Sequence, residues 1–264
     1  MSHRSDRHDW QDLASLDPYW AVLSDRSRKF GGWELDEFLA SGEEEASRLL
    51  AFGQRFGCPR ARRAALDFGC GAGRLTRAFG THFERSVGID VSERMVAEAE
   101  RINADVANVR FVAGGPDLSE FRVEEFDLVY SGLVLQHVSS RPAILRYVAE
   151  LARVLAPGGL LAIQLPSAIP PLKRVQPRRR LYRALRAVRV PPAALYRRLG
   201  LDPIGVWAVA EDEVVGALEG AGASILTLER EDWRGGVRST TYFATRSEAS
   251  APSADVSGGA SAAG

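Results

Sequence analysis

The sequence predicts an α/β protein built on a doubly wound, mostly parallel sheet, and three observations indicate this fold. Short apolar runs alternate along the chain with segments of helical periodicity. One of these runs, residues 160–165, is nearly continuous, as in a parallel strand covered on both faces. Another, residues 64–68, leads directly into glycines at alternate positions and then into a helical segment. Together they predict a strand, a tight turn and a helix at the start of the sheet.

The other elements follow from the same patterns and from capping signals. Ser41 and Glu44 form a capping-box pattern that predicts a helix beginning there, and Ser92 predicts the N-cap of a helix that ends near Asn103. A helix is expected from about residue 140 to Leu155. Alternation or apolar runs predict the remaining strands and the last helix: strands 86–90, 109–113, 126–131, 224–229 and 239–245, and helix 210–221.

The glycine turn predicts a ligand site. Gly69, Gly71 and Gly73 allow a sharp turn at positive φ, and a ligand can approach the backbone where no Cβ stands. A dinucleotide fold requires a third glycine at the position that Arg74 occupies. Asp67, at the end of the strand, would repel a pyrophosphate and attract an ammonium group. The turn therefore favours a ligand that carries positive charge.

The segment 66–73, Leu-Asp-Phe-Gly-Cys-Gly-Ala-Gly, resembles the first motif of the class I S-adenosylmethionine-dependent methyltransferases. Asp90 supplies the acid that this family has at the end of the next strand. The resemblance implies a Rossmann-like sheet of seven strands with an antiparallel last strand. It also implies S-adenosylmethionine as cofactor and S-adenosylhomocysteine as product. Asp67 and the turn would hold the methionine end, and Asp90 would accept both ribose hydroxyls.

Three further residues are candidates for cofactor contacts. Arg74 is a candidate partner for the methionine carboxylate, with an exposed position in the first helical turn as the alternative. The family usually places an acidic or amide residue near the adenine, directly after the third strand. Gly115 occupies that place here and Asp117 follows two residues later, so either the backbone of 114–115 or the Asp117 side chain would serve.

The fourth strand and the segment after it, residues 132–138, resemble the part of the family fold that faces the methyl group. His137 is the candidate general base for a hydroxyl acceptor, with a hydrogen bond inside the loop as the alternative. Ser131 at the strand end is a candidate cofactor contact, Gln136 is a candidate substrate contact, and Tyr130 is a candidate for shaping the site or for hydrogen bonding there. The scattered histidines and the two cysteines predict no metal site.

The chain divides into six predicted segments. Residues 1–9 are polar and are expected to be disordered. Residues 10–60 are an N-terminal lid and helical segment. Within it, residues 10–33 are either a lid over the active site or a segment anchored by aromatics outside the core, and Tyr19 and Trp20 are candidate substrate contacts. Residues 61–165 form the cofactor-binding core and 209–246 complete it. Residues 247–264 are a Ser/Ala/Gly-rich tail that is expected to be disordered.

Residues 166–208 form a basic helical insert after the fifth strand. Between residues 166 and 206 it holds many arginines and a single acid, Asp202. The insert could be a cap that binds an anionic or carrier-bound acceptor, a surface for anionic lipid through residues 173–198, or a solvated basic face. Leu181, Tyr182, Leu185 and Val188 are expected on one helical face.

The overall composition narrows the functional class. The 264 residues carry 34 basic and 34 acidic side chains, so net charge predicts no nucleic-acid partner. With no apolar leader and no long apolar run, the protein is expected to be cytoplasmic. No Asp/Asn-Pro-Pro-aromatic run follows the fourth strand, which disfavours methylation of nucleic-acid bases.

The sequence thus predicts methyl transfer to a small molecule, most simply at oxygen, as in tailoring of natural products, sugars or lipids in secondary metabolism. Two alternatives remain open. One is a nucleic-acid methyltransferase that uses the basic insert to follow phosphates. The other is a catalytically silent S-adenosylmethionine-binding partner protein. The sequence does not predict the oligomeric state.

Overall fold

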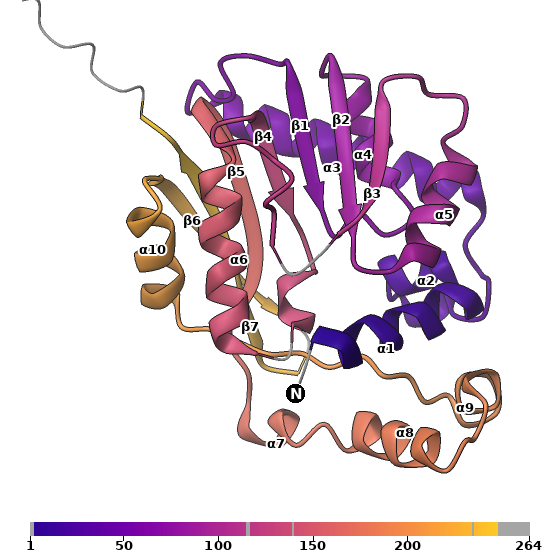
Figure 1. Cartoon of the computed structure of the whole chain (residues 1–264). Helices are drawn as coiled ribbons and strands as arrows, with labels where there is room; N and C mark the ends of the chain where they lie inside the picture. The colour runs from indigo at the N-terminus through magenta and orange to yellow at the C-terminus, as the bar shows by residue number, and fades with distance from the viewer. Residues whose placement is uncertain (1–2, 115–116, 139, 234, 248–264) are drawn as a thin grey trace, which may run out of the picture.

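The computed structural model describes residues 3–114, 117–138, 140–233 and 235–247, and it contains the predicted seven-stranded sheet (Figure 1). The strand order is β3-β2-β1-β4-β5-β7-β6. β7 runs antiparallel to both of its neighbours, and the other pairs are parallel, which confirms the predicted fold class. The strands are β1 (Ala64–Phe68), β2 (Arg85–Asp90), β3 (Val109–Ala113), β4 (Phe126–Ser131), β5 (Leu155–Ala168), β6 (Ser224–Trp233) and β7 (Val237–Thr245).

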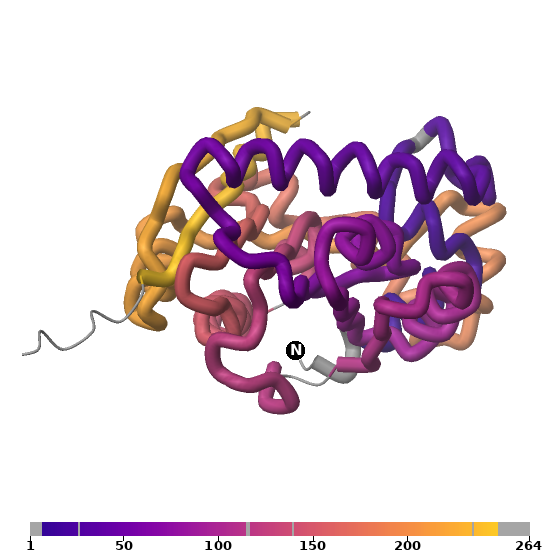
Figure 2. Tube along the Cα trace, turned by 90° about the horizontal axis from the view of Figure 1, so that it is seen from above, coloured from indigo at the N-terminus to yellow at the C-terminus, as the bar shows by residue number. Residues whose placement is uncertain are grey.

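Helices cover both faces of the sheet. The α-helices are α1 (His3–Leu16), α2 (Pro18–Val22), α3 (Leu35–Gln54), α4 (Arg74–Gly80), α5 (Glu93–Ile102), α6 (Arg141–Arg153), α7 (Pro171–Arg174), α8 (Pro177–Ala187), α9 (Pro192–Leu199) and α10 (Glu211–Gly220). Two short 3₁₀ helices are η1 (Arg26–Arg28) and η2 (Leu135–His137). The long helix α3 crosses one face together with α4, and α6 and α10 cover the other (Figure 2).

The core explains why β5 is so apolar. Leu161 and Ile163 pack among the residues of α6 and α10, whereas Leu160 and Ala162 pack among those of α3 and α4. Successive side chains of a strand point to opposite faces, so a strand buried on both sides needs apolar residues at nearly every position. β5 also extends beyond the predicted run at both ends, and α6 ends at Arg153 rather than at Leu155.

The predicted start of α3 at Ser41 is wrong. The helix begins at Leu35, with Glu34 as its N-cap and Asp36 and Glu37 in its first turn, where carboxylates favour the helix dipole. Ser41 lies inside the helix, and its hydroxyl donates to the carbonyl of Phe38 at 2.6 Å. A hydroxyl bonded back to its own helix no longer caps the backbone. By contrast, the Ser92 cap is confirmed, because its Oγ accepts from Met95 N at 3.3 Å.

Gly42 is the point where α3 approaches the start of α4, and this gives a test of the packing. A Cβ on Gly42 would lie 2.5 Å from the carbonyl oxygen of Arg74. We therefore expect Gly42→Ala to lower the free energy of unfolding by about 2–3 kcal/mol, although alanine is the better helix former. Gly216→Ala in α10 is the matched control, since nothing lies within 4 Å of its Cβ. That variant should gain up to about 1 kcal/mol in urea denaturation, and equal effects of the two changes would contradict the packing.

The prediction that residues 1–9 are disordered is wrong from residue 3 onward, because α1 begins at His3. α1 is held by contacts from a distant part of the chain. Asp9 pairs with Arg183 at 2.6 Å, and Asp12 accepts from Arg186 at 3.1 Å and from the Tyr182 hydroxyl at 3.1 Å. The helix is stable here because α8 supplies its counter-charges and because its apolar face, with Leu13, packs against Met95 and Tyr196. Residues 1–2 and 248–264 of the two predicted disordered ends lie outside the described residues.

The insert of residues 166–208 is helical, as predicted, and holds α7, α8 and α9. Together with α1 it lies below the sheet in Figure 1, beyond the ends of β1 and β2. The predicted apolar face of α8 is split, however. Tyr182 is buried and Leu185 is half-buried, whereas Leu181 and Val188 are exposed, because the side facing α1 also takes three arginines. Among the described residues, no helix is long and apolar enough to cross a membrane.

Candidate active site

The glycine turn between β1 and α4 forms as predicted. Gly69, Gly71 and Gly73 all have positive φ, at 79°, 52° and 81°. Side chains from other elements close in on the first two: a Cβ on Gly69 would lie 2.3 Å from Val134, and one on Gly71 would lie 2.4 Å from Val22. The turn therefore needs glycine for its backbone angles and for its close contacts. Gly73 is the N-cap of α4 and packs against Phe111.

Asp90, at the end of β2, joins the turn to the next helix. Its Oδ2 accepts from Gly71 N at 2.9 Å and its Oδ1 accepts from Ser92 N at 2.8 Å. The carboxyl group lies in the wall of a cavity, and its removal from water raises its pKa to about 6. Asp90 thus presents a half-buried acceptor at the point where a ligand would meet the turn.

Asp67 is placed differently from Asp90. It is 3% exposed and accepts from the Thr76 hydroxyl at 2.7 Å, beneath the turn and outside the residues that line the cavity. Burial raises its pKa from 3.8 to about 7. In the unfolded chain this carboxyl ionises near its ordinary pKa, so between about pH 4 and 7 the folded state binds more protons. Charging Asp67 therefore destabilises the ligand-free fold as the pH rises through this window.

An Asp67→Asn variant tests this linkage. The amide oxygen can still accept from Thr76, and no charge is buried at high pH. The free energy of unfolding of the variant, relative to the parent, should rise by about 2–4 kcal/mol between about pH 4.5 and 7.5. Urea denaturation of ligand-free protein measures it. Asp105→Asn is the control, because Arg77 lowers the pKa of the exposed Asp105. The difference in free energy of unfolding between this variant and the parent should stay constant over the same pH range.

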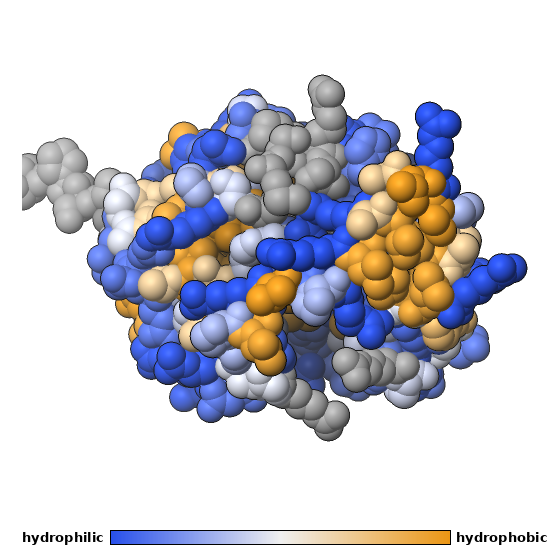
Figure 3. All heavy atoms as spheres, turned by 90° about the horizontal axis from the view of Figure 1, so that it is seen from below, coloured by the Kyte–Doolittle hydropathy of each residue, from blue (hydrophilic) through white to orange (hydrophobic). Residues whose placement is uncertain are grey.

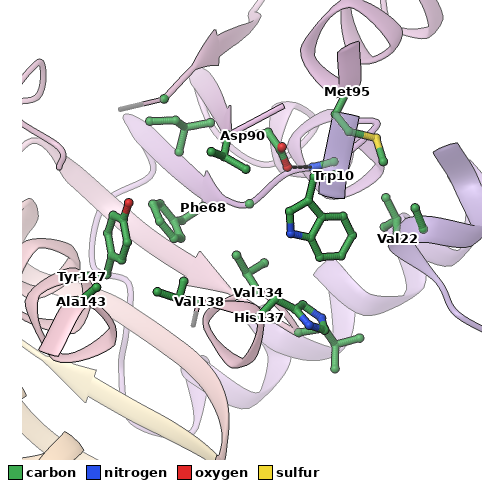
Figure 4. Close-up of a pocket in the computed structure, with 18 of the residues that line it drawn as sticks. Trp10, Val22, Phe68, Asp90, Met95, Val134, His137, Val138, Ala143 and Tyr147 are labelled. Carbon is green, nitrogen blue, oxygen red and sulfur yellow. Dashed lines mark hydrogen bonds between the residues drawn. The ribbon is translucent and has the colours of Figure 1, made fainter. Parts of the chain in front are cut away.

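A cavity of about 320 Å³ opens above Gly69, Gly71 and Asp90, a size typical of small-molecule sites. Figure 4 shows Trp10 of α1 between Asp90 and His137. The walls are mostly apolar and come from α2, β1, α5, the segment after β4, and α6: Val22, Phe68, Met95, Val134, Val138, Ala143 and Tyr147. Their contacts with a ligand would exclude water from its polar atoms.

His137 lies in this cavity at the end of η2. Its Nδ1 is 2.7 Å from the carbonyl oxygen of Gly205, and a carbonyl only accepts, so Nδ1 carries the proton. Nε2 is then the basic nitrogen, and Gln136 Nε2 lies 3.2 Å from it. The Trp10 ring meets the imidazole edge-on, with centroids 5.1 Å apart. The insert, through Gly205, therefore fixes the tautomer of the one histidine in the cavity wall.

Arg74 is buried, so the alternative of an exposed first-turn residue is wrong. Its guanidinium donates to Glu45 at 2.6 Å and to the carbonyl of Ser41 at 3.2 Å. The Tyr130 hydroxyl donates to the other oxygen of Glu45 at 2.5 Å. Burial, with Glu45 as its neighbour, raises the Tyr130 pKa well above its usual value. In this conformation the network ties α3 to α4 and β4, and Arg74 does not line the cavity.

Of the other predicted residues, Gly114 lines the cavity, as the prediction of a backbone contact there requires, whereas Ser131, Asp117, Tyr19 and Trp20 do not line it. Ser131 is fully buried at the end of β4, and its Oγ has no partner among the described residues. Asp117 bonds to Ser119, and Gly115 lies outside the described residues. The Tyr19 hydroxyl donates to Glu98 at 2.9 Å, and Trp20 Nε1 donates to the carbonyl of Asp25 at 2.9 Å. Tyr19 therefore ties α2 to α5, and Trp20 ties α2 to the segment that follows it.

Sequence reasoning missed most of the cavity wall. Trp10 was one of several aromatics in a segment without a regular period, and only the fold brings it to His137. The part of the wall that α6 supplies had only a weak sequence signal. Arg146 and Tyr147 follow Ala143 by three and four residues, which places all three on one helical face. Arg146 is exposed and is a cation at the cavity wall.

A family model described as a methyltransferase domain matches residues 66–163, the part that holds the turn, Asp90 and His137. The match confirms, for residues 66–163, the predicted resemblance to the class I S-adenosylmethionine-dependent methyltransferases. A trans-aconitate 2-methyltransferase of Deinococcus radiodurans is 36% identical to it over 104 residues. The match covers 39% of this chain and 37% of that relative, so the chain spans well under two thirds of its length.

Solved structures share the methyltransferase fold over nearly the whole chain. The N-methyltransferase NodS from Bradyrhizobium japonicum, in complex with S-adenosylhomocysteine, has a TM-score of 0.59 and 17% identity, over 92% of this chain and 99% of its own. The [4+2]-cyclase SpnF has a TM-score of 0.61 and 14% identity, over 91% and 94%. Because one of these proteins is a cyclase, this methyltransferase fold does not by itself fix the reaction.

Proposed function

We propose that this chain is a methyltransferase that transfers the methyl group of S-adenosylmethionine to an oxygen atom of a small acceptor. The observation that carries the proposal is the cavity that joins the glycine turn and Asp90 on one side to His137 on the other. The cofactor's sulfonium makes its methyl carbon electrophilic, so the protein has mainly to align the acceptor and exclude water.

The residues present fit this cofactor. Gly69 and Gly71 leave their backbone open to close approach, and any side chain there would collide with Val134 or Val22. Asp90 supplies an acceptor pair for two vicinal hydroxyls such as those of the ribose. Phe68, Val138 and Tyr147 supply the apolar surface that a purine ring requires.

The acceptor would bind near Trp10 and His137. Nε2 of His137 can take the proton of a hydroxyl acceptor, while the Gly205 carbonyl stabilises the imidazolium that results through Nδ1–H. Trp10 and Val134 keep water from the reacting atoms. These roles use side chains of the cavity wall together with the Gly205 carbonyl behind His137.

Arg146 favours an acceptor that carries negative charge. It is a cationic side chain of the cavity wall. The pKa of Asp117 is lowered mainly by hydrogen bonds from Ser119, and the charge of Arg146 contributes a smaller part. The Deinococcus relative is named for trans-aconitate, which is a carboxylate. We include carboxylates among the proposed oxygen acceptors for this reason.

Calorimetric titration with S-adenosylmethionine and S-adenosylhomocysteine, with NAD as the control, tests the cofactor. Micromolar binding of the first two and none of NAD is expected. A screen of small hydroxy and carboxy acids, with detection of S-adenosylhomocysteine, then tests transfer. Tight binding of NAD, or no binding of either adenosyl compound, would contradict the proposal. Binding without transfer to any acceptor would favour a silent partner or a different reaction.

A further inference from the structure

The helix α8 turns three of its arginines toward α1 and leaves a row of apolar side chains exposed. Its charged and polar side faces inward: Arg179 and Tyr182 are buried, and Arg183 and Arg186 pair with the aspartates of α1. Its outward side carries an apolar row at spacings of four, three and four residues, made of Pro177, Leu181, Ala184 and the C-cap Val188, with the exposed Arg178 and Arg180 beside it. Leu181 is 50% exposed and Val188 is 71% exposed. A surface helix of a soluble domain normally turns its polar face outward.

The apolar surface continues onto the neighbouring helices. Of the nine large apolar side chains that are exposed among the described residues, five lie between residues 172 and 199. We name these five the α7–α9 patch: Leu172, Val175, Leu181, Val188 and Leu199. Figure 3 shows this underside, with orange residues gathered where α8 and α9 lie and blue side chains around them. Such a concentration marks an interaction surface rather than scattered surface residues.

The patch is bordered by cations that no carboxylate neutralises. Arg180, Arg189, Arg197 and Arg198 are exposed and make no ion pair within the described part of the chain. Arg178 donates to the carbonyl of Gly200, which leaves its charge in place. Asp202, the one acid between residues 166 and 206, is already paired with Lys29 at 3.2 Å.

We propose that the α7–α9 patch binds the surface of an anionic lipid bilayer. Aliphatic side chains that stand out from short helices and are ringed by arginines suit the boundary between headgroups and acyl chains. Arginine can keep its charge among the phosphates while its stem lies on the apolar layer. A second copy of this chain would bring a patch of the same positive charge, so self-association through it is disfavoured.

This inference is independent of the proposed methyl transfer, because none of the five patch residues lines the cavity. The patch and the cavity lie on opposite sides of the unit formed by α8 and α1: the inner face of α8 holds α1, and Trp10 of α1 reaches into the cavity. Lipid binding would therefore use the outer face of the insert and would not cover the cavity.

Flotation of the full chain with vesicles tests the proposal. Vesicles of phosphatidylcholine with about one-third phosphatidylglycerol should bind the protein at low salt, and vesicles of phosphatidylcholine alone should bind it far less. A triple Arg180→Gln, Arg197→Gln, Arg198→Gln variant should lose roughly 100-fold in partitioning to the anionic vesicles. A Leu181→Ser, Val188→Ser variant should lose about tenfold at all salt concentrations. All five side chains are exposed, so the variants should fold as the parent does.

Val123→Ser and Arg110→Gln are matched controls, since both residues are exposed and lie outside the insert. Neither should change vesicle binding. Equal binding to neutral and anionic vesicles, or none to either at low salt, would overturn the proposal. Dimerisation or binding of an acidic carrier protein that depends on Leu181 and Val188, without vesicle binding, would overturn it in favour of a protein partner.

Discussion

Asp90→Ala should bind S-adenosylhomocysteine at least about 100-fold more weakly than the parent, because two charge-assisted hydrogen bonds to the ribose would be lost. The change also removes the acceptor of Gly71 N and Ser92 N. The ligand-free variant should therefore lose about 1–3 kcal/mol of stability, and circular dichroism shows whether it remains folded. Calorimetric titration of the folded variant gives the affinity.

Asp117→Ala is the matched control for this experiment. Its carboxylate belongs to the loop after the neighbouring strand, but it is exposed, bonds to Ser119 and does not line the cavity. Its loss should change the affinity by less than about threefold. If a folded Asp90→Ala variant bound the ligand as tightly as the parent, the placement of the ribose at Asp90 would be wrong.

His137→Gln should leave the affinity for the cofactor nearly unchanged and lower kcat for a hydroxyl acceptor by about 10²- to 10⁴-fold. Glutamine can still donate to the Gly205 carbonyl, so the contact with the insert is retained while the basic nitrogen is lost. The parent should show a fall in kcat at low pH that the variant lacks. Steady-state kinetics over a range of pH measures both effects.

The acceptor itself supplies the control for His137. A carboxylate is already a nucleophile and needs no base, so its methylation should be slowed much less by the same variant. Equal and small losses with both kinds of acceptor would contradict the role of His137 as a base. Such a result would leave it as a residue that positions the loop through Gly205 and Gln136.

The core of the fold was predictable because its signals are local. Gly69, Gly71 and Gly73 adopt the positive φ that the turn demands, and Ser92 caps the helix that its position predicts. The alternation of strands and helices then leaves few ways to arrange a parallel sheet. These features depend on residues close together in the chain, where sequence patterns are informative.

The parts that were missed depend on distant pairs. Ser41 resembles a helix cap, but the helix begins earlier, at Leu35. Its residue Gly42 lies where the helix packs closely against the backbone of Arg74. Residues 1–9 are polar and have no partners nearby in the sequence. In the folded chain Arg183 and Arg186, some 170 residues away, pair with the aspartates of α1. For the same reason Trp10 reaches the cavity, whereas the side chains of Tyr19 and Trp20 do not line it.

The ion pairs between α1 and α8 have a consequence for ligand affinity. Trp10 and both paired aspartates belong to one helix, so a ligand that displaces the indole by moving α1 works against the pairs with Arg183 and Arg186. The observed affinity is then the intrinsic affinity multiplied by the fraction of molecules in which the helix has already moved. High ionic strength weakens the pairs and raises that fraction. Ligand exchange by this protein should accordingly become faster as salt is added, even for a ligand that carries no net charge.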